Sequence, residues 1–99
     1  MNNQEYNDKV KNVAEIIKAL SHPTRLCIVC KLMLKELNVS EMQDCLVIPQ
    51  STVSQHLSIL KSRGIIEGKR NGSEVIYSIV NEDIKNVVKV FFAENEIPM

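Results

Sequence analysis

The sequence predicts a mainly α-helical domain with one β-hairpin, an α+β arrangement in a single unit over residues 1–99. Two observations support this fold class. Several stretches repeat apolar residues at the three- and four-residue spacing of a helix. Near the C-terminal third, a short apolar run, the turn signal Asn71-Gly72 and an alternating stretch from Ser73 to Val80 indicate two paired strands. Ninety-nine residues suffice for one domain with a modest core.

The composition is that of an ordinary water-soluble protein, with 44% hydrophobic and 24% charged residues. No apolar run reaches the roughly 18 residues that a membrane helix needs. The first ten residues are polar and of mixed charge, unlike a signal peptide, so we expect a cytoplasmic protein. Three cysteines are an odd set, which argues against a structural disulfide framework.

The first helix is predicted over about residues 7–20, where the apolar residues fall on one face. These are Val10, Val13, Ala14, Ile17 and Leu20. Pro23 disfavours helical geometry in the residue before it and suits the first position of a new helix. A second helix is therefore expected from Pro23 to about Lys35, and its broad apolar stripe places it at the centre of the core. His22, just before it, is interpreted as a capping or turn residue.

A short third helix is expected from about residue 40 to Leu46, with Ser40 as its N-cap. After the turn at residues 47–49, Val53, Leu57 and Leu60 recur at helical spacing. The two helices form a helix-turn-helix over about residues 40–63.

The other face of this fourth helix is rich in uncharged hydrogen-bonding groups. Such groups both donate and accept, which suits the base edges of a DNA major groove, although a plain solvated surface is the alternative. The predicted DNA-contacting residues of this helix are Gln50, Ser51, Thr52, Ser54, Gln55 and His56, followed by Lys61 and Arg63.

The hairpin, about residues 65–80, places Lys69 and Arg70 at its tip, where they can reach phosphate or the minor groove. The chain has no net charge, but residues 50–80 hold a net +2 from four cations and two acids. Helix, turn, helix and hairpin together predict a winged helix.

The last helix, about residues 81–94, has Ile84, Val87, Val88 and Phe91 on one face. So small a chain has too few elements to cover two apolar terminal helices. We therefore expect a homodimer paired through the first and last helices, whose two recognition helices would bind a palindromic operator.

The stretches SHPTRLCIVCKL and STVSQHL, followed by a glycine-tipped basic hairpin, resemble the ArsR/SmtB family of bacterial winged-helix repressors. The resemblance covers roughly residues 10–92. It implies a DNA-bound homodimer that represses its own operon and releases DNA when an effector binds. By the family pattern, the polar residues at 50–56 would face the groove, and Lys69 and Arg70 the flanking backbone.

The resemblance predicts no metal site. One class of the family binds metal through Cys-x-Cys before the third helix, and here those positions are Asn38 and Ser40. Another class uses Asp and His residues of the last helix, which here contains Asp83 but no histidine.

Thiol chemistry is the remaining basis for sensing. Cys27 and Cys30 are three residues apart on one helical face, and position 30 resembles a cysteine of the sulfide and persulfide sensors in this family. Those sensors pair it with a cysteine of the last helix, which is absent here. The site would use Cys27 with Cys30, or Cys45, or would link two subunits; for Cys45 a structural role is the favoured reading. Reactive sulfur species or oxidants are the first expected effectors, and arsenite or another thiophilic ion at Cys27 and Cys30 the second; a packing role for Cys30 is the alternative.

Two other function classes fit the sequence less well. An enzyme is not expected, because no phosphate-binding loop, catalytic triad or metal cluster is present in the sequence. A winged helix that binds protein instead of DNA would be expected to carry an acidic or apolar face on the fourth helix, and this face is neither.

Overall fold

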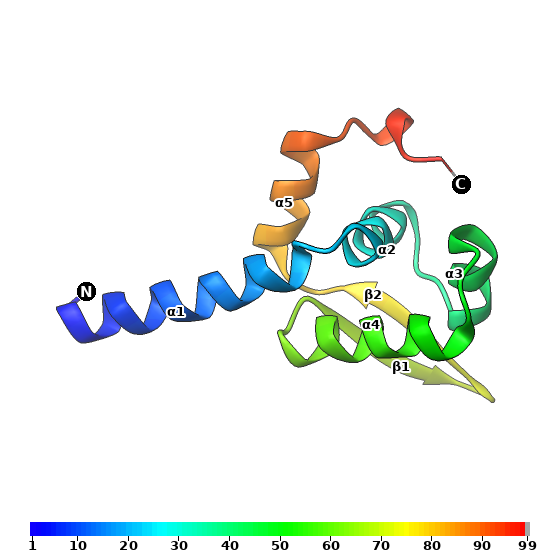
Figure 1. Cartoon of the computed structure of the whole chain (residues 1–99), viewed down its shortest axis with the longest axis horizontal. Helices are drawn as coiled ribbons and strands as arrows, with labels where there is room; N and C mark the ends of the chain where they lie inside the picture. The colour runs from blue at the N-terminus through cyan, green and yellow to red at the C-terminus, as the bar shows by residue number, and fades with distance from the viewer. Residues whose placement is uncertain (99) are drawn as a thin grey trace.

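The structure, a computed structural model, describes residues 1–98 apart from the side chain of Cys45. Its elements follow in the order α1 (Asn3–Leu20), α2 (Pro23–Leu34), α3 (Val39–Leu46), α4 (Gln50–Ser62), β1 (Ile66–Asn71), β2 (Glu74–Ile79), α5 (Glu82–Phe91) and a 3₁₀ turn (Glu94–Glu96) (Figure 1). The predicted class, mainly helical with a β-hairpin, is confirmed.

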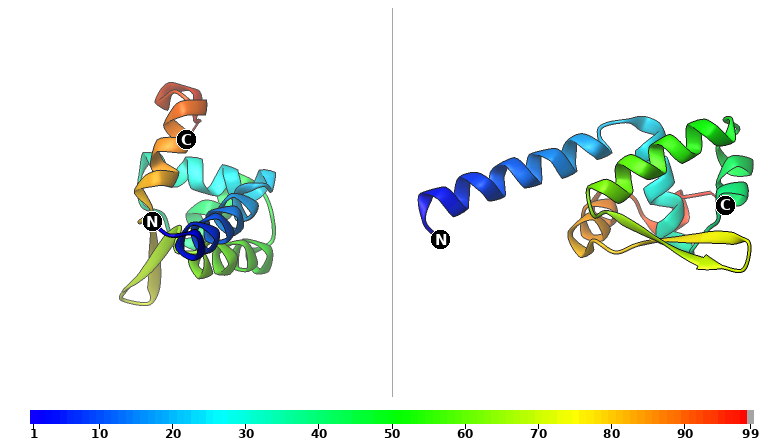
Figure 2. Two further views of the ribbon diagram at one scale, coloured as in Figure 1. Left: turned by 90° about the vertical axis from the view of Figure 1, so that its left-hand side faces the viewer. Right: turned by 90° about the horizontal axis from the view of Figure 1, so that it is seen from below.

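Helix α2 lies in the middle of the body, with α4 and the hairpin on one side and α5 on the other (Figures 1 and 2). Helix α1 projects away from this body, and every residue from 1 to 15 is exposed. None of the helices within residues 1–98 is both long and apolar enough to cross a membrane.

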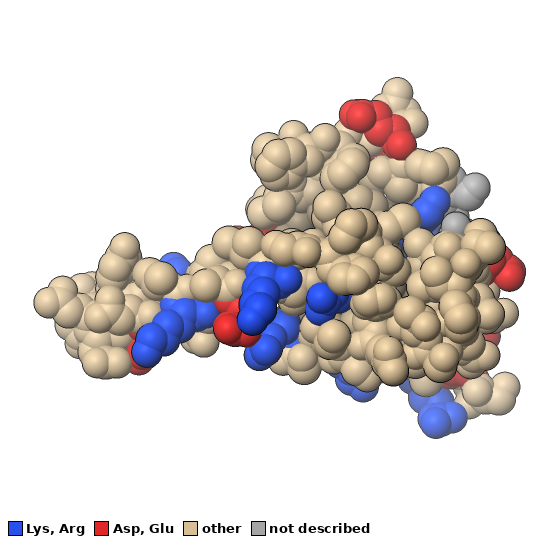
Figure 3. All heavy atoms as spheres, in the orientation of Figure 1, with Lys and Arg blue, Asp and Glu red and all other residues tan. Residues whose placement is uncertain are grey.

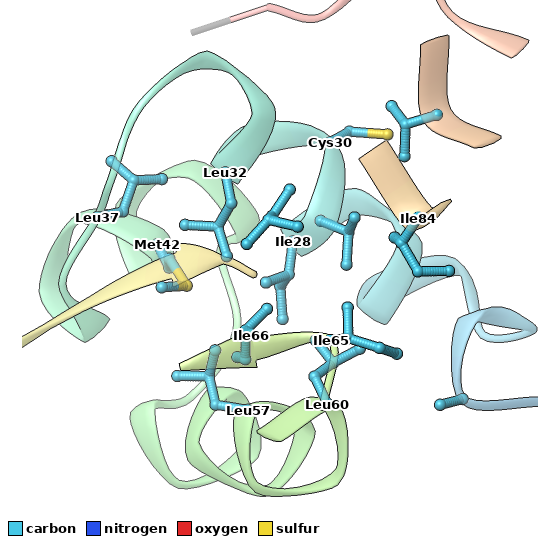
Figure 4. Close-up of a cluster of buried hydrophobic side chains, with 14 of the residues drawn as sticks. Ile28, Cys30, Leu32, Leu37, Met42, Leu57, Leu60, Ile65, Ile66 and Ile84 are labelled. Atoms are coloured by element: carbon cyan, nitrogen blue, oxygen red, sulfur yellow. The ribbon is translucent and has the colours of Figure 1, made fainter. Parts of the chain in front are cut away.

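The core fills the space between α2, α4 and the hairpin (Figure 4). Its largest fully buried side chains are Ile28, Val29, Leu37, Met42, Val53, Leu57, Leu60, Ile65, Ile66 and Val88. Because three residues of α4 are in this set, one side of that helix is fixed against the core and the other is left free.

Side-chain caps set two helix starts that differ from the predictions. Helix α1 begins four residues early because the Asn2 side chain accepts a hydrogen bond from the Glu5 amide, 2.8 Å. The N-cap of α3 is Asn38, so the prediction of Ser40 is wrong. Asn38 Oδ1 accepts from the Glu41 amide at 2.8 Å, and the Asn38 amide donates to Glu41 Oε1 at 3.0 Å, which is a reciprocal capping box.

The turn between α3 and α4 is strained at Val47, which has φ 54° and is 87% exposed. A β-branched residue rarely adopts this left-handed conformation. The other end of α4 is relaxed: Gly64, at φ 72°, follows the helix. The Gly64 amide donates to the Lys61 carbonyl and the Ile65 amide to the Leu60 carbonyl, both at 3.1 Å, which is a Schellman motif.

The hairpin pairs β1 with β2 from Ile66 opposite Ile79 to Asn71 opposite Glu74. Its two-residue turn is therefore Gly72-Ser73, one residue later than predicted, with Gly72 at φ 66°. Leu37 adds an isolated bridge to β2, exchanging two backbone hydrogen bonds with Tyr77 at 2.8 and 3.2 Å. This bridge joins the segment before α3 to the hairpin.

Helix α5 ends at Phe91, three residues before the predicted end. Phe92 is extended, with φ −130°, and packs against the core, so the chain cannot continue as a helix.

Candidate nucleic-acid interface

One side of α4 forms an uncharged polar ridge. The side chains of Val53, Leu57 and Leu60 are buried, and the opposite side of the helix is open to solvent. We define the α4 ridge as the exposed residues Ser51, Ser54, Gln55 and Ser58. Gln50 is also exposed and Thr52 is half-buried. The ridge has hydroxyl and amide groups for base edges and no charge of its own.

Ser58 was missed at the sequence level. It is three residues after Gln55 and seven after Ser51, so helical spacing puts all three on one face. The predicted contacts of this helix run from Gln50 to His56 and resume at Lys61, so they pass over Ser58 although the same spacing includes it.

His56 is set apart from the ridge, on the flank of α4 that faces α2. Its half-buried ring lies 4.6 Å, centroid to centroid, from the ring of His22. His56 Nδ1 and Arg25 Nε are buried without a hydrogen-bond partner among the described residues. Burial first, and then the neighbouring His22 and Arg25, lower the pKa of His56 and so favour the neutral ring.

His22 is the N-cap of α2, as predicted. Its Nδ1 accepts a hydrogen bond from the Thr24 amide at 3.2 Å. The cap therefore positions the ring against which His56 packs.

The hairpin tip presents Lys69 and Arg70 to solvent. Lys69 forms an exposed ion pair with Glu67 at 3.6 Å, which is weak enough for a phosphate to replace. Asn38 Nδ2 donates to Glu74 Oε2 at 2.6 Å. This bond links the start of α3 to the strand that leaves the tip, so the hairpin is held in a set position relative to the helix-turn-helix.

The two cations at the end of α4 differ in their surroundings. Lys61 is exposed in the last turn. Arg63, just after the helix, forms an exposed ion pair with Glu15 of α1 at 3.1 Å. The ion pair thus places Arg63 beside α1.

The two described thiols lie on α2. Cys27 is half-buried, whereas Cys30 is only 6% exposed, and its sulfur is directed toward α5 (Figure 4). Burial, and then the neighbouring Cys27, raise the pKa of Cys30, with Lys31 acting in the opposite direction. The Cys45 side chain is outside the described residues. Over the described part of the chain, no three His, Cys, Asp or Glu side chains gather in a way that could hold a metal ion.

A helix-turn-helix whose second helix is exposed on one side, followed by a basic hairpin, defines a winged helix-turn-helix domain. Residues 22–67 match the family model described as bacterial regulatory protein, arsR family. The chain belongs to this family, because relatives with more than 30% identity are covered over most of their length.

Three proteins illustrate the similarity. The transcriptional repressor PagR of Bacillus anthracis is 41% identical over 78 residues, 78% of each chain. Its crystal structure matches with a TM-score of 0.80 over 87% of this chain and 99% of that one. The homodimeric winged helix-turn-helix DNA-binding domain Mb0332 of Mycobacterium bovis gives a TM-score of 0.82 at 27% identity, over 92% and 83% of the two chains. The transcriptional repressor SmtB of Mycobacterium tuberculosis is 40% identical over 74 residues, which are 75% of this chain but only 55% of SmtB.

Proposed function

We propose that this chain is a homodimeric, DNA-binding transcriptional repressor that is released from its operator through cysteine chemistry. The observation that best supports DNA binding is that one domain exposes both the uncharged α4 ridge and the hairpin cations Lys69 and Arg70. Repression is supported by the names of the relatives PagR and SmtB.

The ridge and the hairpin have separate roles in this proposal. Gln55, at the centre of the ridge, has the amide geometry that pairs with adenine in the major groove. Arg70 and Lys69 contact phosphates and set the position of the domain on the duplex without selecting sequence. A protein-binding winged helix is the rival function, and it predicts no preference for promoter DNA.

The test is fluorescence anisotropy with the chain's own promoter and with random DNA of equal length. Gln55→Ala should weaken promoter binding about 5- to 150-fold, the effect of one bidentate base contact, and leave random DNA unchanged. Arg70→Ala should weaken both and reduce the salt dependence. Gln4→Ala, on the far end of α1, is the matched control. Equal loss of promoter and random DNA in Gln55→Ala would rule out base reading by that residue.

The dimer is supported by two apolar surfaces that one subunit leaves open. Tyr6, Val10, Val13 and Ile17 of α1 are exposed along one face, and Phe91 of α5 is 72% exposed. Between the two helices lies a mostly apolar cleft of about 580 Å³ lined by Ile17, Leu20, Ser21, Leu26, Ile84, Val87, Val88, Phe91 and Phe92. Exposed apolar surface of this extent is typical of an interface, and the homodimeric relative Mb0332 uses the same fold.

The sensor is proposed at Cys27 and Cys30. Cys27 is the more accessible thiol and the entry point for a reagent, while Cys30 lies at the packing between α2 and α5. With hydrogen peroxide, the two thiols lose two electrons and two protons to form a disulfide, and peroxide becomes two waters. Modification of Cys30 would displace α5 and so change the spacing of the two recognition helices. A coupling of about 1–3 kcal/mol would suffice for a useful switch.

The sensor test titrates the reduced protein on promoter DNA with persulfide, hydrogen peroxide, arsenite and zinc, and reads intact mass on the same samples. Release with a mass change confined to Cys27 and Cys30 is the expected result, and the effective reagent identifies the chemistry. Full release of a Cys30→Ser variant would exclude this site. Indifference to all four reagents would assign the cysteines to packing.

A further inference from the structure

A basic cleft lies where α1, the start of α2 and the end of α4 meet. It has a volume of about 230 Å³ and is lined by Glu15, Lys18, Ala19, Arg25, Ile59 and Arg63. Three of these side chains are cationic and one is acidic. The volume is several times the roughly 30 Å³ that one water occupies in the liquid, so the cleft has room for a phosphate group.

The cleft is separate from the hairpin cations. Figure 3 shows blue side chains gathered where α1 joins the body, over the adjoining end of α4, and a second group at the lower right by the hairpin. Helix α4 lies between the two groups, and its 13 residues span roughly 20 Å. A major groove is about 12 Å wide, so a helix placed in it would have cations at both ends, one group for each bordering sugar–phosphate backbone.

Arg25, one of the two arginines of this cleft, has an unsatisfied hydrogen-bond donor within the subunit. Arg25 Nε is buried and donates no hydrogen bond to any described residue. A guanidinium binds phosphate through two parallel hydrogen bonds, and such charge-assisted bonds are the strong ones. Arg63 is paired with Glu15, but both side chains are nearly half exposed, so this pair is weak and open to exchange.

We infer that Lys18, Arg25 and Arg63 form a second backbone clamp, which binds the DNA phosphates on the opposite border of the groove from Lys69 and Arg70. Glu15 opposes this clamp by holding Arg63 and by repelling the phosphate. The inference rests on the proposed DNA-binding function. It adds Lys18 and Arg25 as contacts and gives Glu15 a role as a competitor.

The test is the slope of log affinity against log salt for the full-length protein on promoter and random DNA. Lys18→Gln and Arg25→Gln should each make the negative slope shallower by about 1 per subunit, or about 2 per dimer. Each should weaken binding to both DNAs equally. Glu15→Gln should tighten both. Lys35→Gln, an exposed lysine at the other end of α2, is the charge-matched control and should change neither slope nor specificity.

Lys18 is exposed, so its variant remains informative if Arg25→Gln fails to fold. If Lys18→Gln and the control Lys35→Gln had the same slope of log affinity against log salt, the clamp would be overturned while the proposed function stayed intact. Looser binding by Glu15→Gln would also count against it. Failure of the unmodified protein to prefer its promoter would instead defeat the proposed function, and the clamp with it.

Discussion

Helices α4 and α1 both repeat apolar residues at helical spacing, but these residues have different surroundings in the structure. In α4 the apolar residues Val53, Leu57 and Leu60 are buried against α2 and the hairpin. In α1 the equivalent set, Val10, Val13 and Ile17, is exposed along a helix that projects from the body. The comparison teaches that apolar spacing identifies one face of a helix but does not tell whether its own subunit buries that face.

The largest expected contrast comes from the same truncation in both helices. Leu57 is 2% exposed, so its packing is complete within one subunit. Leu57→Ala should therefore lower the unfolding free energy by about 2–5 kcal/mol. Ile17 is 57% exposed, so Ile17→Ala should lower the unfolding free energy of the dilute monomer far less, but it should weaken the association of two subunits. Urea unfolding and sedimentation at several protein concentrations measure the two effects.

A contradictory outcome is easily recognised. Ile17→Ala could instead lose a large part of its unfolding free energy at concentrations where no dimer forms. That result would mean that α1 is stabilised from within its own subunit. An unchanged dimer would place the subunit interface elsewhere.

A second, smaller contrast comes from two asparagine N-caps. Asn38 caps α3 and also bonds to Glu74 of the hairpin, whereas Asn81 caps α5 by accepting from the Ile84 amide at 3.1 Å. Either residue replaced by Ala should lose about 1 kcal/mol through the cap. Only Asn38→Ala should also increase amide exchange in β2 and weaken binding to all DNA. Equal effects on β2 from both variants would show that the link to Glu74 does not hold the hairpin.

The smallest effect concerns pH at the flank of α4. The pKa of His56 is lowered in the folded chain, so the unfolded chain takes up a proton first as pH falls below about 6.5. The free energy of unfolding should therefore be greatest above this pH and decrease as the solution is acidified toward the folded pKa. Urea titrations at pH 7.5, 6.5 and 5.5 should show this decrease, and a flatter one in His56→Gln. If the unmodified chain and His56→Gln had identical pH profiles, His56 would not be the cause of the decrease.

Much of the architecture was predictable because periodicity and turn residues report local structure directly. The order of the five helices and the hairpin follows from apolar spacing together with Pro23, Gly64 and Gly72. The α4 ridge was mostly predictable as well, since buried and exposed faces alternate with the same period.

What the sequence missed depends on contacts between distant residues. The Leu37–Tyr77 bridge and the Asn38–Glu74 bond join positions about 40 apart, and no local pattern signals them. The packing of His56 on His22, and the pairing of Arg63 with Glu15, likewise arise from how helices cross. The predictions about DNA contacts, the effector and the subunit interface remain predictions.

The projecting turns of α1 have a consequence for dynamics. An isolated helix of a dozen residues is marginal in water, and every residue in the first three turns of α1, residues 3–14, is exposed in the single subunit. Their backbone amides should exchange with deuterium within seconds in a lone subunit and become protected wherever another surface covers them. Residues 3–14 are thus a built-in reporter, whose exchange times against protein concentration would map the covering surface residue by residue.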